Sequence, residues 1–260
     1  MNDLLGVRIL VTGATSGIGR VTVDALRERG AEVLVHGRDR AKVDAIADPG
    51  AGFVADLASL DEVVALSREL PDLDVLVNNA GVGFGADRTR REISADGFEL
   101  RMAVNLLAPV VLTERLTTRG QPGRAVVNVA SIGQLALDPT DWMSERSYDG
   151  VAAYRRSKLA LIDWTFDRAR SDPARSWVAL HPGTLLDTGM VRDAGISARG
   201  PASRGADNVC TAVEKALGGA TGIYYDERTP TRADEAAYDA VARAQIGQAL
   251  RGWVRPWIEA

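Results

Sequence analysis

The sequence contains little cysteine, histidine or lysine, and these scarcities limit its chemistry. Its 260 residues include one cysteine, Cys210, and two histidines, so an internal disulfide is excluded and no metal-site spacing occurs. We expect Cys210 to be a small buried apolar residue rather than a catalytic one. The net charge of −4 and the lack of a long apolar run argue against nucleic acid and membrane as partners.

The chain shows no sign of division into domains. No linker rich in proline, glycine or serine and no repeat interrupts it, and 46% hydrophobic residues suffice for a substantial core. We therefore predict a single domain over residues 1–260. Residues 1–5 carry no basic, apolar leader, so a cytoplasmic protein is expected.

Short apolar runs alternate with segments of helical periodicity along the chain. This alternation predicts an α/β fold in which helices cover both faces of a parallel sheet. Seven strands are predicted, at residues 8–12, 32–35, 52–55, 74–77, 125–130, 177–181 and 222–225. The predicted helices include residues 20–29, 40–47, 59–69, 94–116 and 151–170. Two irregular stretches, 132–150 and 185–205, follow strand ends, where such a sheet binds its ligands.

A glycine-rich segment follows the first predicted strand and leads into a helix. It runs Thr12-Gly13-Ala14-Thr15-Ser16-Gly17-Ile18-Gly19, and its glycines permit a tight turn that points the helix N-terminus at a pyrophosphate. The spacing differs from the Gly-x-Gly-x-x-Gly pattern of many dinucleotide-binding proteins. A turn without a ligand is the alternative, but the strand before it and the helix after it favour a cofactor loop.

The residues after the second strand indicate which dinucleotide is bound. An acidic residue there would hold a free ribose hydroxyl, whereas the guanidinium of Arg38 suits a 2′-phosphate. We therefore expect NADP(H) rather than NAD(H). The competing interpretation gives the ribose to Asp39 and leaves Arg38 in solvent.

Polar and small residues also end the third and fourth strands. Asp56, with its neighbour Leu57, could meet the adenine, although Asp56 could equally cap the following helix. The segment Asn78-Asn79-Ala80-Gly81 permits close approach of the backbone to a cofactor, or forms only a tight loop.

The scarcity of lysine makes one pair of residues conspicuous. Only three of the thirty-one basic residues are lysine, and Lys158 stands four positions after Tyr154 on a predicted helix. Residues at this spacing share a helix face, and an ammonium beside a phenol lowers the pKa of the phenol. The pair is therefore a candidate acid/base group; an exposed pair without a role is the alternative.

Together these residues resemble the short-chain dehydrogenases/reductases from about residue 7 to the C-terminus. The resemblance rests on Thr12 to Gly19, Asn78 to Gly81, Asn105, Ser131, Tyr154, Lys158 and Pro182-Gly183, which occur in the family's order. It implies a Rossmann-like, doubly wound, seven-stranded sheet in three layers, a nicotinamide cofactor, and hydride transfer to or from a carbonyl or alcohol carbon.

The resemblance also implies a role for each matching residue. Tyr154 would be the acid/base, Lys158 would lower its pKa and hold the nicotinamide ribose, and Ser131 would hydrogen-bond the carbonyl oxygen. Asn105 would position a water that leads to the lysine; as an asparagine within a predicted helix it also suggests a polar task or a local kink. Pro182 and Gly183 would flank the nicotinamide, with Thr188 near the carboxamide or the pyrophosphate.

The segment between Ser131 and Tyr154 is longer than in many family members and resembles the retinol-dehydrogenase-like branch. Members of that branch often carry an N-terminal membrane segment, and this sequence shows none. We therefore expect a soluble, bacterial-type member whose substrate is not a retinoid. The prediction is an NADPH-dependent ketoreductase or alcohol dehydrogenase for a small to medium hydrophobic substrate. A non-catalytic NADP(H)-binding redox sensor is the alternative, and a homo-oligomer is possible.

The apolar side chains of the two irregular stretches form either a substrate pocket or ordinary packing; these are Leu135, Leu137, Trp142, Met143, Leu185, Leu186, Met190 and Val191. The tail with Trp253 and Trp257 caps that pocket, packs on the core or joins subunits. The sequence leaves these alternatives open.

Overall fold

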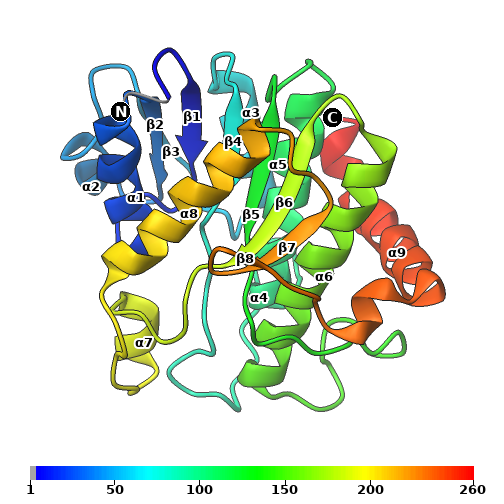
Figure 1. Ribbon diagram of the computed structural model, residues 1–260. Coiled ribbons are helices and arrows are strands. Elements are labelled where there is room, and N and C mark those ends of the chain that lie inside the picture. Colours follow the sequence, from blue (N-terminus) through cyan, green and yellow to red (C-terminus); the bar gives the residue numbers. More distant parts are fainter. Residues whose placement is uncertain (1–3) are drawn as a thin grey trace.

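The strands form one sheet in the order β3-β2-β1-β4-β5-β6-β7-β8 in the computed structural model, which describes residues 4–260 (Figure 1). The first three residues of the predicted domain lie outside this range. The strands are β1 Arg8–Val11, β2 Glu32–Gly37, β3 Gly52–Val54, β4 Val75–Asn78, β5 Ala125–Val129, β6 Ser176–His181, β7 Ile223–Asp226 and β8 Thr229–Pro230. All neighbours pair in parallel except β7 and β8.

The sequence predicted seven strands, and the sheet has an eighth. The missed strand, β8, has two residues, Thr229 and Pro230, and pairs antiparallel with β7 through a short turn. Two residues are too few to show a period, and proline is confined to sheet edges, where β8 lies.

Helices cover both faces of the sheet and make a three-layer architecture. One face carries α1 (Gly17–Glu28) and α8 (Ala202–Leu217), and the other carries α3 (Leu60–Glu69), α5 (Ala108–Thr117) and α6 (Gly150–Ser171). The C-terminal helix α9 (Ala240–Ile258) packs on the outer side of α3, α5 and α6. The short elements are α2 (Arg40–Asp44), α4 (Leu100–Met102), η1 (Ala103–Leu107), α7 (Gly189–Asp193) and η2 (Glu235–Tyr238).

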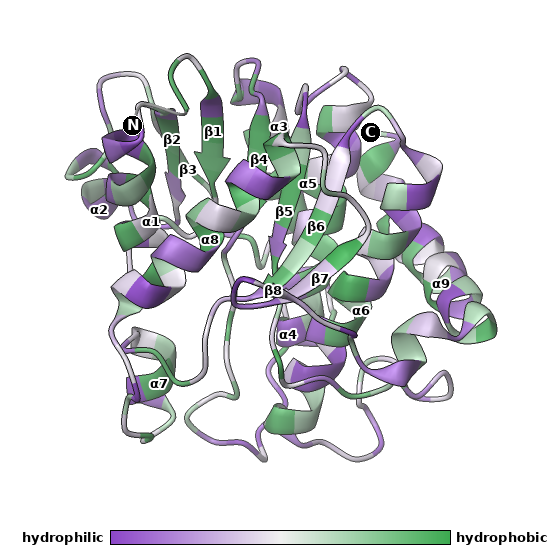
Figure 2. Ribbon diagram, viewed as in Figure 1, coloured by the Kyte–Doolittle hydropathy of each residue, from purple (hydrophilic) through white to green (hydrophobic). Residues whose placement is uncertain are grey.

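Side chains of the central strands alternate between two apolar cores. In β1, Ile9 and Val11 join the core beneath α1 and α8, whereas Leu10 joins the core beneath α3, α5 and α6. Both faces of a parallel strand are buried, which explains the continuous apolar runs and the green strands of Figure 2. Cys210 is fully buried in the first core, as expected.

Two tryptophans of α9 pack on the body of the molecule. The ring of Trp253 lies edge-on to Trp142, with 5.7 Å between centroids. The ring of Trp257 lies edge-on to Phe98 at 6.1 Å, and its Nε1 donates to Asp61 at 2.9 Å. Packing on the core is thus the alternative that the structure supports for this tail.

One predicted helix is shorter than expected, and one predicted loop is partly helical. Residues 94–99 precede α4 without helical structure, because Gly97 has a φ of +84° and Glu99 caps α4 by accepting from the Met102 N–H. The stretch 185–205 contains α7, which Thr188 caps, and ends within α8. Both differences arise from local capping, which apolar periodicity does not register.

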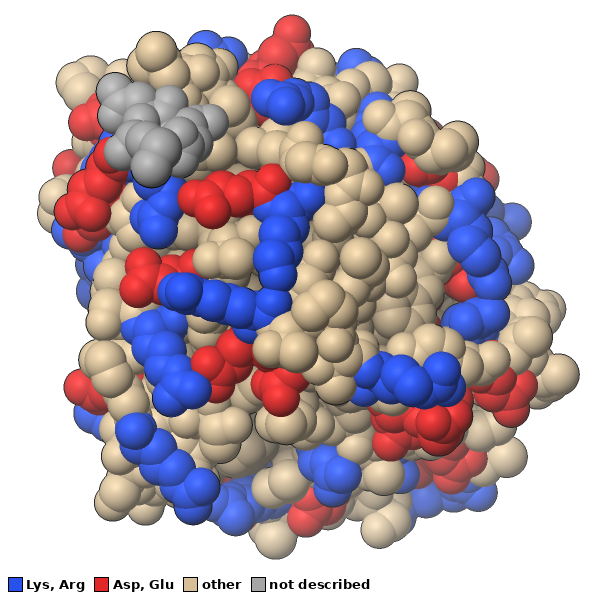
Figure 3. Space-filling model, viewed as in Figure 1, with Lys and Arg blue, Asp and Glu red and all other residues tan. Residues whose placement is uncertain are grey.

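Acidic and basic side chains alternate over the face of the molecule shown in Figure 3. Among residues 4–260, no helix combines the length and the apolar character that crossing a membrane requires.

Candidate active site

The strand order reverses between β1 and β4, and the glycine-rich loop lies at this point. Gly13 has a φ of +64°, and a Cβ there would lie 2.8 Å from the Ala80 Cα. Gly17 has a φ of +54° and faces Thr188. Only glycine combines these conformations with such close approach, so the loop after β1 fits tightly against the loop after β4.

Five consecutive backbone N–H groups of this loop, from Thr15 to Gly19, have no hydrogen-bond partner within residues 4–260. Ser16 is the N-cap of α1, but its side chain makes no capping bond. Unpaired amides at a helix N-terminus, aided by the helix dipole, bind anions. The donor set therefore fits a dinucleotide pyrophosphate.

The hydroxyl of Thr12 ties the loops after β1 and β4 together. Its Oγ1 accepts from the N–H of Asn79 and of Ala80, each at 3.0 Å. The Asn79 side chain returns two bonds, to the carbonyls of Thr12 at 2.8 Å and Gly13 at 3.3 Å. These contacts hold Asn79, Ala80 and Gly81 beside the glycine-rich loop.

His36 was missed by the sequence analysis and joins three strand ends. Its Nδ1 accepts from the Gly13 N–H at 3.3 Å, and its Nε2 lies 3.2 Å from the Ala55 carbonyl. Burial lowers its pKa to about 4, so the ring is neutral and Nε2 carries the proton. The histidine therefore fixes the glycine-rich loop against β2 and the end of β3.

Arg38 and Asp39 differ in how they are engaged. Arg38 is exposed, and its side chain makes no hydrogen bond or ion pair with any residue from 4 to 260. Asp39 is the N-cap of α2 and accepts from the Lys42 N–H at 3.2 Å. The Asp39 carboxylate is thus engaged at the helix cap, and the Arg38 guanidinium is available to bind a ligand.

Asp56 does not cap the helix that follows it, which was one of its two predicted roles. It accepts from the Ala58 N–H at 2.9 Å within a turn, and Ser59 is the N-cap of α3. Asp56 stays exposed at the end of β3, while the Leu57 side chain is buried.

Asn105 lies in a π-helical turn, η1, between α4 and α5, so a local irregularity accompanies the polar residue as predicted. Its Oδ1 accepts from the Val82 N–H at 2.8 Å, and its Nδ2 donates to the Val82 carbonyl at 3.1 Å and to Ser157 Oγ at 3.0 Å. A Cβ on Gly81 would lie 3.1 Å from Asn105 Oδ1 and 3.4 Å from Lys158 Nζ. Asn105, Gly81 and Lys158 are therefore neighbours.

Lys158 is 4% exposed, and its Nζ donates to the Val129 carbonyl at 2.8 Å. The same atom lies 5.9 Å from the centroid of the Tyr154 ring. Burial lowers the pKa of Lys158 to about 8. Helix α6 thus presents the ammonium and the phenol on one side, as their spacing predicted.

Ser131 follows β5 and faces Tyr154. Its Oγ accepts from the Gly133 N–H at 3.0 Å, and its side chain lies beside the Tyr154 phenol. Burial raises the pKa of Tyr154, and the neighbouring Ser131 side chain lowers it in part. The net direction is opposite to the lowering by Lys158 that was expected, because burial of the phenol is the largest influence on its pKa.

Pro182 and Gly183 follow β6 at the same edge of the sheet. The Pro182 carbonyl accepts from Asn208 Nδ2 at 2.9 Å, and Gly183 has a φ of +135°. A Cβ on Gly17 would lie 3.2 Å from Thr188 Cγ2, which places Thr188 beside the glycine-rich loop. Its predicted role toward the carboxamide or the pyrophosphate stays a prediction.

These residues lie together along one edge of the sheet. Comparison with known proteins shows which family has this arrangement. A family model described as short chain dehydrogenase matches residues 8–197. The chain belongs to the short-chain dehydrogenase/reductase family. It is accordingly an NAD(P)-dependent oxidoreductase that acts on a small molecule.

Relatives in this family include reductases and dehydrogenases. A proposed daunorubicin C-13 ketoreductase, DnrU, of Streptomyces sp. (strain C5) is 33% identical over 267 residues, 95% of this chain and 92% of that protein. Retinol dehydrogenase 14 of Mus musculus is 37% identical over 211 residues, but the match covers 69% of this chain and 61% of that protein.

Solved structures share the fold. A protein from Mycobacterium paratuberculosis superposes with a TM-score of 0.76 at 28% identity, over 96% of this chain and 94% of that one. A short chain dehydrogenase from Burkholderia cenocepacia J2315 in complex with NADP gives 0.63 at 25% identity, over 86% and 98%.

Three further side chains of this short-chain dehydrogenase contact the candidate catalytic residues and were not predicted. The Tyr224 hydroxyl, from β7, donates to the Ser131 carbonyl at 2.9 Å, where Gln134 Nε2 donates at 3.0 Å. The Phe84 ring lies edge-on to Tyr154, with 5.0 Å between centroids. A tyrosine and a phenylalanine in apolar surroundings carry no sequence signal, since their roles depend on which strand ends meet.

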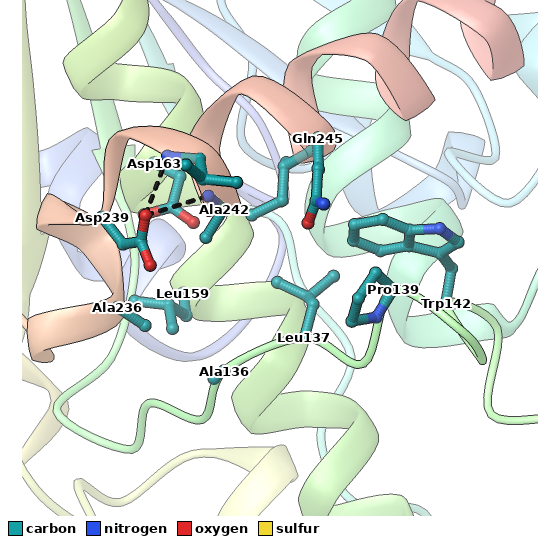
Figure 4. Close-up of a pocket in the computed structure, with 12 residues that line it drawn as sticks. Ala136, Leu137, Pro139, Trp142, Leu159, Asp163, Ala236, Asp239, Ala242 and Gln245 are labelled. Atoms are coloured by element: carbon teal, nitrogen blue, oxygen red, sulfur yellow. Dashed lines mark hydrogen bonds between the residues drawn. The ribbon is translucent and has the colours of Figure 1, made fainter.

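The two stretches expected to line a substrate pocket behave differently. Met190 lies against Gly83, where an added Cβ would be 2.5 Å from its Cγ, close to the loop that carries Phe84. Leu137 and Trp142 instead line a cavity between α6 and α9, so they pack away from the candidate catalytic residues (Figure 4). These two residues therefore do not line the surroundings of Tyr154.

Proposed function

We propose that this enzyme is an NADPH-dependent ketoreductase or alcohol dehydrogenase with Tyr154 as its general acid/base. The observation that carries the proposal is the buried phenol of Tyr154, which has the Ser131 side chain and the buried Lys158 ammonium beside it. A phenol, a hydroxyl and a cation in contact can protonate an oxygen and stabilise negative charge on it.

The residues divide this work between them. When bound, the nicotinamide supplies or accepts the hydride. Negative charge that develops on the substrate oxygen would be met by the Ser131 hydroxyl, whose Oγ is held in place by the Gly133 N–H. Tyr154 would donate its proton to the same oxygen. Lys158 and Asn105, which adjoin Gly81, would hold the ribose and a water that restores the proton.

Cofactor selection is proposed to favour NADP(H). Arg38 is exposed at the end of β2 with its guanidinium unengaged within residues 4–260, whereas Asp39 is occupied at the α2 cap. A guanidinium binds a 2′-phosphate through paired hydrogen bonds, which a ribose hydroxyl does not offer. The relative from Burkholderia cenocepacia, which binds NADP, agrees with this preference.

The proposed substrate is a small to medium hydrophobic ketone, aldehyde or alcohol. Phe84 packs on Tyr154, and Met190 covers Gly83 beside it, so the surroundings of the phenol are apolar. The relative named as a daunorubicin ketoreductase, which this chain matches over most of its length, favours a ketone.

The test is NADPH oxidation with a panel of ketones and aldehydes, followed by mass analysis of products formed from deuterated NADPH. We expect turnover of hydrophobic carbonyl compounds with one deuterium on the carbinol carbon. NADPH binding without turnover of any compound would favour the non-catalytic sensor and overturn the proposal.

A further inference from the structure

A cavity of about 230 Å³ lies on the outer side of α6, between that helix, the loop after Ser131 and the start of α9. Figure 4 shows Asp163 and Asp239 at one end with Leu159 beside them, Trp142 at the other end, and Leu137 between. Cavities of about 150 Å³ accept benzene, so this one has room for a ring and a short chain.

Asp163 is the unusual residue of this cavity. Its side chain is 2% exposed and lines the cavity, yet it makes no hydrogen bond or ion pair with residues 4–260, and Oδ1 is fully buried without a partner. Burying a carboxyl without a partner is costly, and native proteins rarely do so without a reason.

The charges around Asp163 are mainly negative. Asp167 lies one turn further along α6, Asp234 precedes η2, and Asp239 caps α9 by accepting from the N–H groups of Val241 and Ala242. The nearby cation, Arg243, is directed to Asp167 at 3.6 Å and to the Ala237 carbonyl at 2.9 Å. A positive ligand group would therefore be stabilised beside Asp163.

We infer that this cavity is a second ligand site, which binds a small primary amine with an aromatic or branched apolar body. The ammonium meets the Asp163 carboxylate, and the body lies against Trp142, Leu137 and Leu159. Cation and apolar surface are thus matched at opposite ends of one cavity.

The site is separate from the candidate catalytic residues. Asp163 follows Tyr154 by nine residues, about two and a half helical turns, so the two side chains project from opposite sides of α6. Tyr154 and Lys158 face the sheet edge, where Lys158 bonds Val129, while Asp163 faces α9. The inference does not depend on the proposed reductase activity.

The first test is calorimetric titration of the full chain with 2-phenylethylamine and with its neutral analogue 2-phenylethanol. We expect saturable binding of the amine and a loss of at least about tenfold in affinity in Asp163→Asn, with the alcohol unaffected by that change. The control variant Tyr154→Phe, whose change lies outside the cavity, should bind the amine within about threefold of wild type.

The affinity should also depend on pH. Burial raises the pKa of Asp163 to about 8, so an ammonium must displace a proton from it at lower pH. Wild-type affinity should rise between about pH 6 and pH 8, whereas Asp163→Asn should show no such rise.

A second measurement keeps the inference testable if Asp163→Asn does not fold. The indole N–H resonance of Trp142, identified with Trp142→Phe, should shift on titration of wild type with 2-phenylethylamine. The inference is overturned by absence of saturable binding at millimolar amine, by equal binding to Asp163→Asn, or by loss of binding in Tyr154→Phe.

Discussion

At the scale of residues, the sequence identified the groups that carry recognisable chemistry and missed those that act through contacts. The Tyr154 and Lys158 pair is rare by composition, so it could be recognised without a structure. His36 and Tyr224 could not, because each acts by reaching a backbone group from another strand, at Gly13 and Ser131. Such contacts depend on strand order, which a single sequence leaves open.

Arg38→Ala should discriminate between the two nicotinamide dinucleotides. Loss of charge-assisted bonds to a 2′-phosphate costs about 1.5–3 kcal/mol, so NADPH binding should weaken about 10- to 100-fold and NADH binding little. Fluorescence titration of both cofactors measures this. Equal losses for the two would remove the 2′-phosphate argument.

Tyr224→Phe removes one of two donors to the Ser131 carbonyl. We expect a loss of about 1 kcal/mol in the free energy of unfolding, because Gln134 still satisfies that oxygen. If Tyr224 positions Ser131, kcat should fall while KM stays nearly constant. If the Tyr224→Phe variant stays folded and its kcat equals that of wild type, Tyr224 has only a structural role.

At the scale of elements, periodicity located most helices but not their irregular turns. The helix predicted over residues 94–116 is interrupted by Gly97 and by η1, in which Asn105 bonds both backbone groups of Val82. The asparagine hinted at this interruption, whereas the Val82 contact could not be foreseen. The sequence did not decide whether Leu137 and Trp142 line a pocket or pack in the core, because α9, which covers them, was not predicted.

Asp163 should make the packing of α9 on α6 sensitive to pH. Its folded-state pKa of about 8 exceeds the ordinary value of 3.8, so between these values the folded state binds more protons than the unfolded state. Its contribution to the free energy of unfolding is therefore greatest at low pH and declines as pH rises to about 8.

Urea unfolding of wild type and Asp163→Asn at about pH 6 and pH 9 isolates this contribution. The variant should gain more than about 1 kcal/mol relative to wild type on going to the higher pH. A difference that does not change with pH would mean that Asp163 titrates normally.

At the scale of the whole molecule, the sequence predicted the layered α/β fold because alternating apolar runs and amphipathic helices allow few other arrangements. The edge strand β8 escaped prediction, since sheet pairing rather than sequence defines two residues as a strand. The meeting of β1 and β4, locked by Thr12, determines where the candidate cofactor site lies.

NADPH should stabilise the whole fold by binding where the loops after β1 and β4 meet. A ligand at a hundredfold excess over its Kd adds about 2.7 kcal/mol, which raises Tm by several degrees in differential scanning fluorimetry. Gly13→Ala should lower Tm and abolish the NADPH-dependent rise, because its φ of +64° and the 2.8 Å approach to Ala80 exclude a side chain. Gly50→Ala, with a φ of +78° and open space around it, is the matched control for strain alone. A normal NADPH response in Gly13→Ala would argue against a cofactor site at this loop.

The central claim is that Tyr154 transfers the proton during carbonyl reduction. The most direct measurement is steady-state NADPH oxidation by wild type and Tyr154→Phe with a ketone that the wild type accepts. The account predicts a fall in kcat/KM of about 10²- to 10⁴-fold in the variant, with NADPH affinity within a few-fold of wild type. Full turnover by Tyr154→Phe would contradict it.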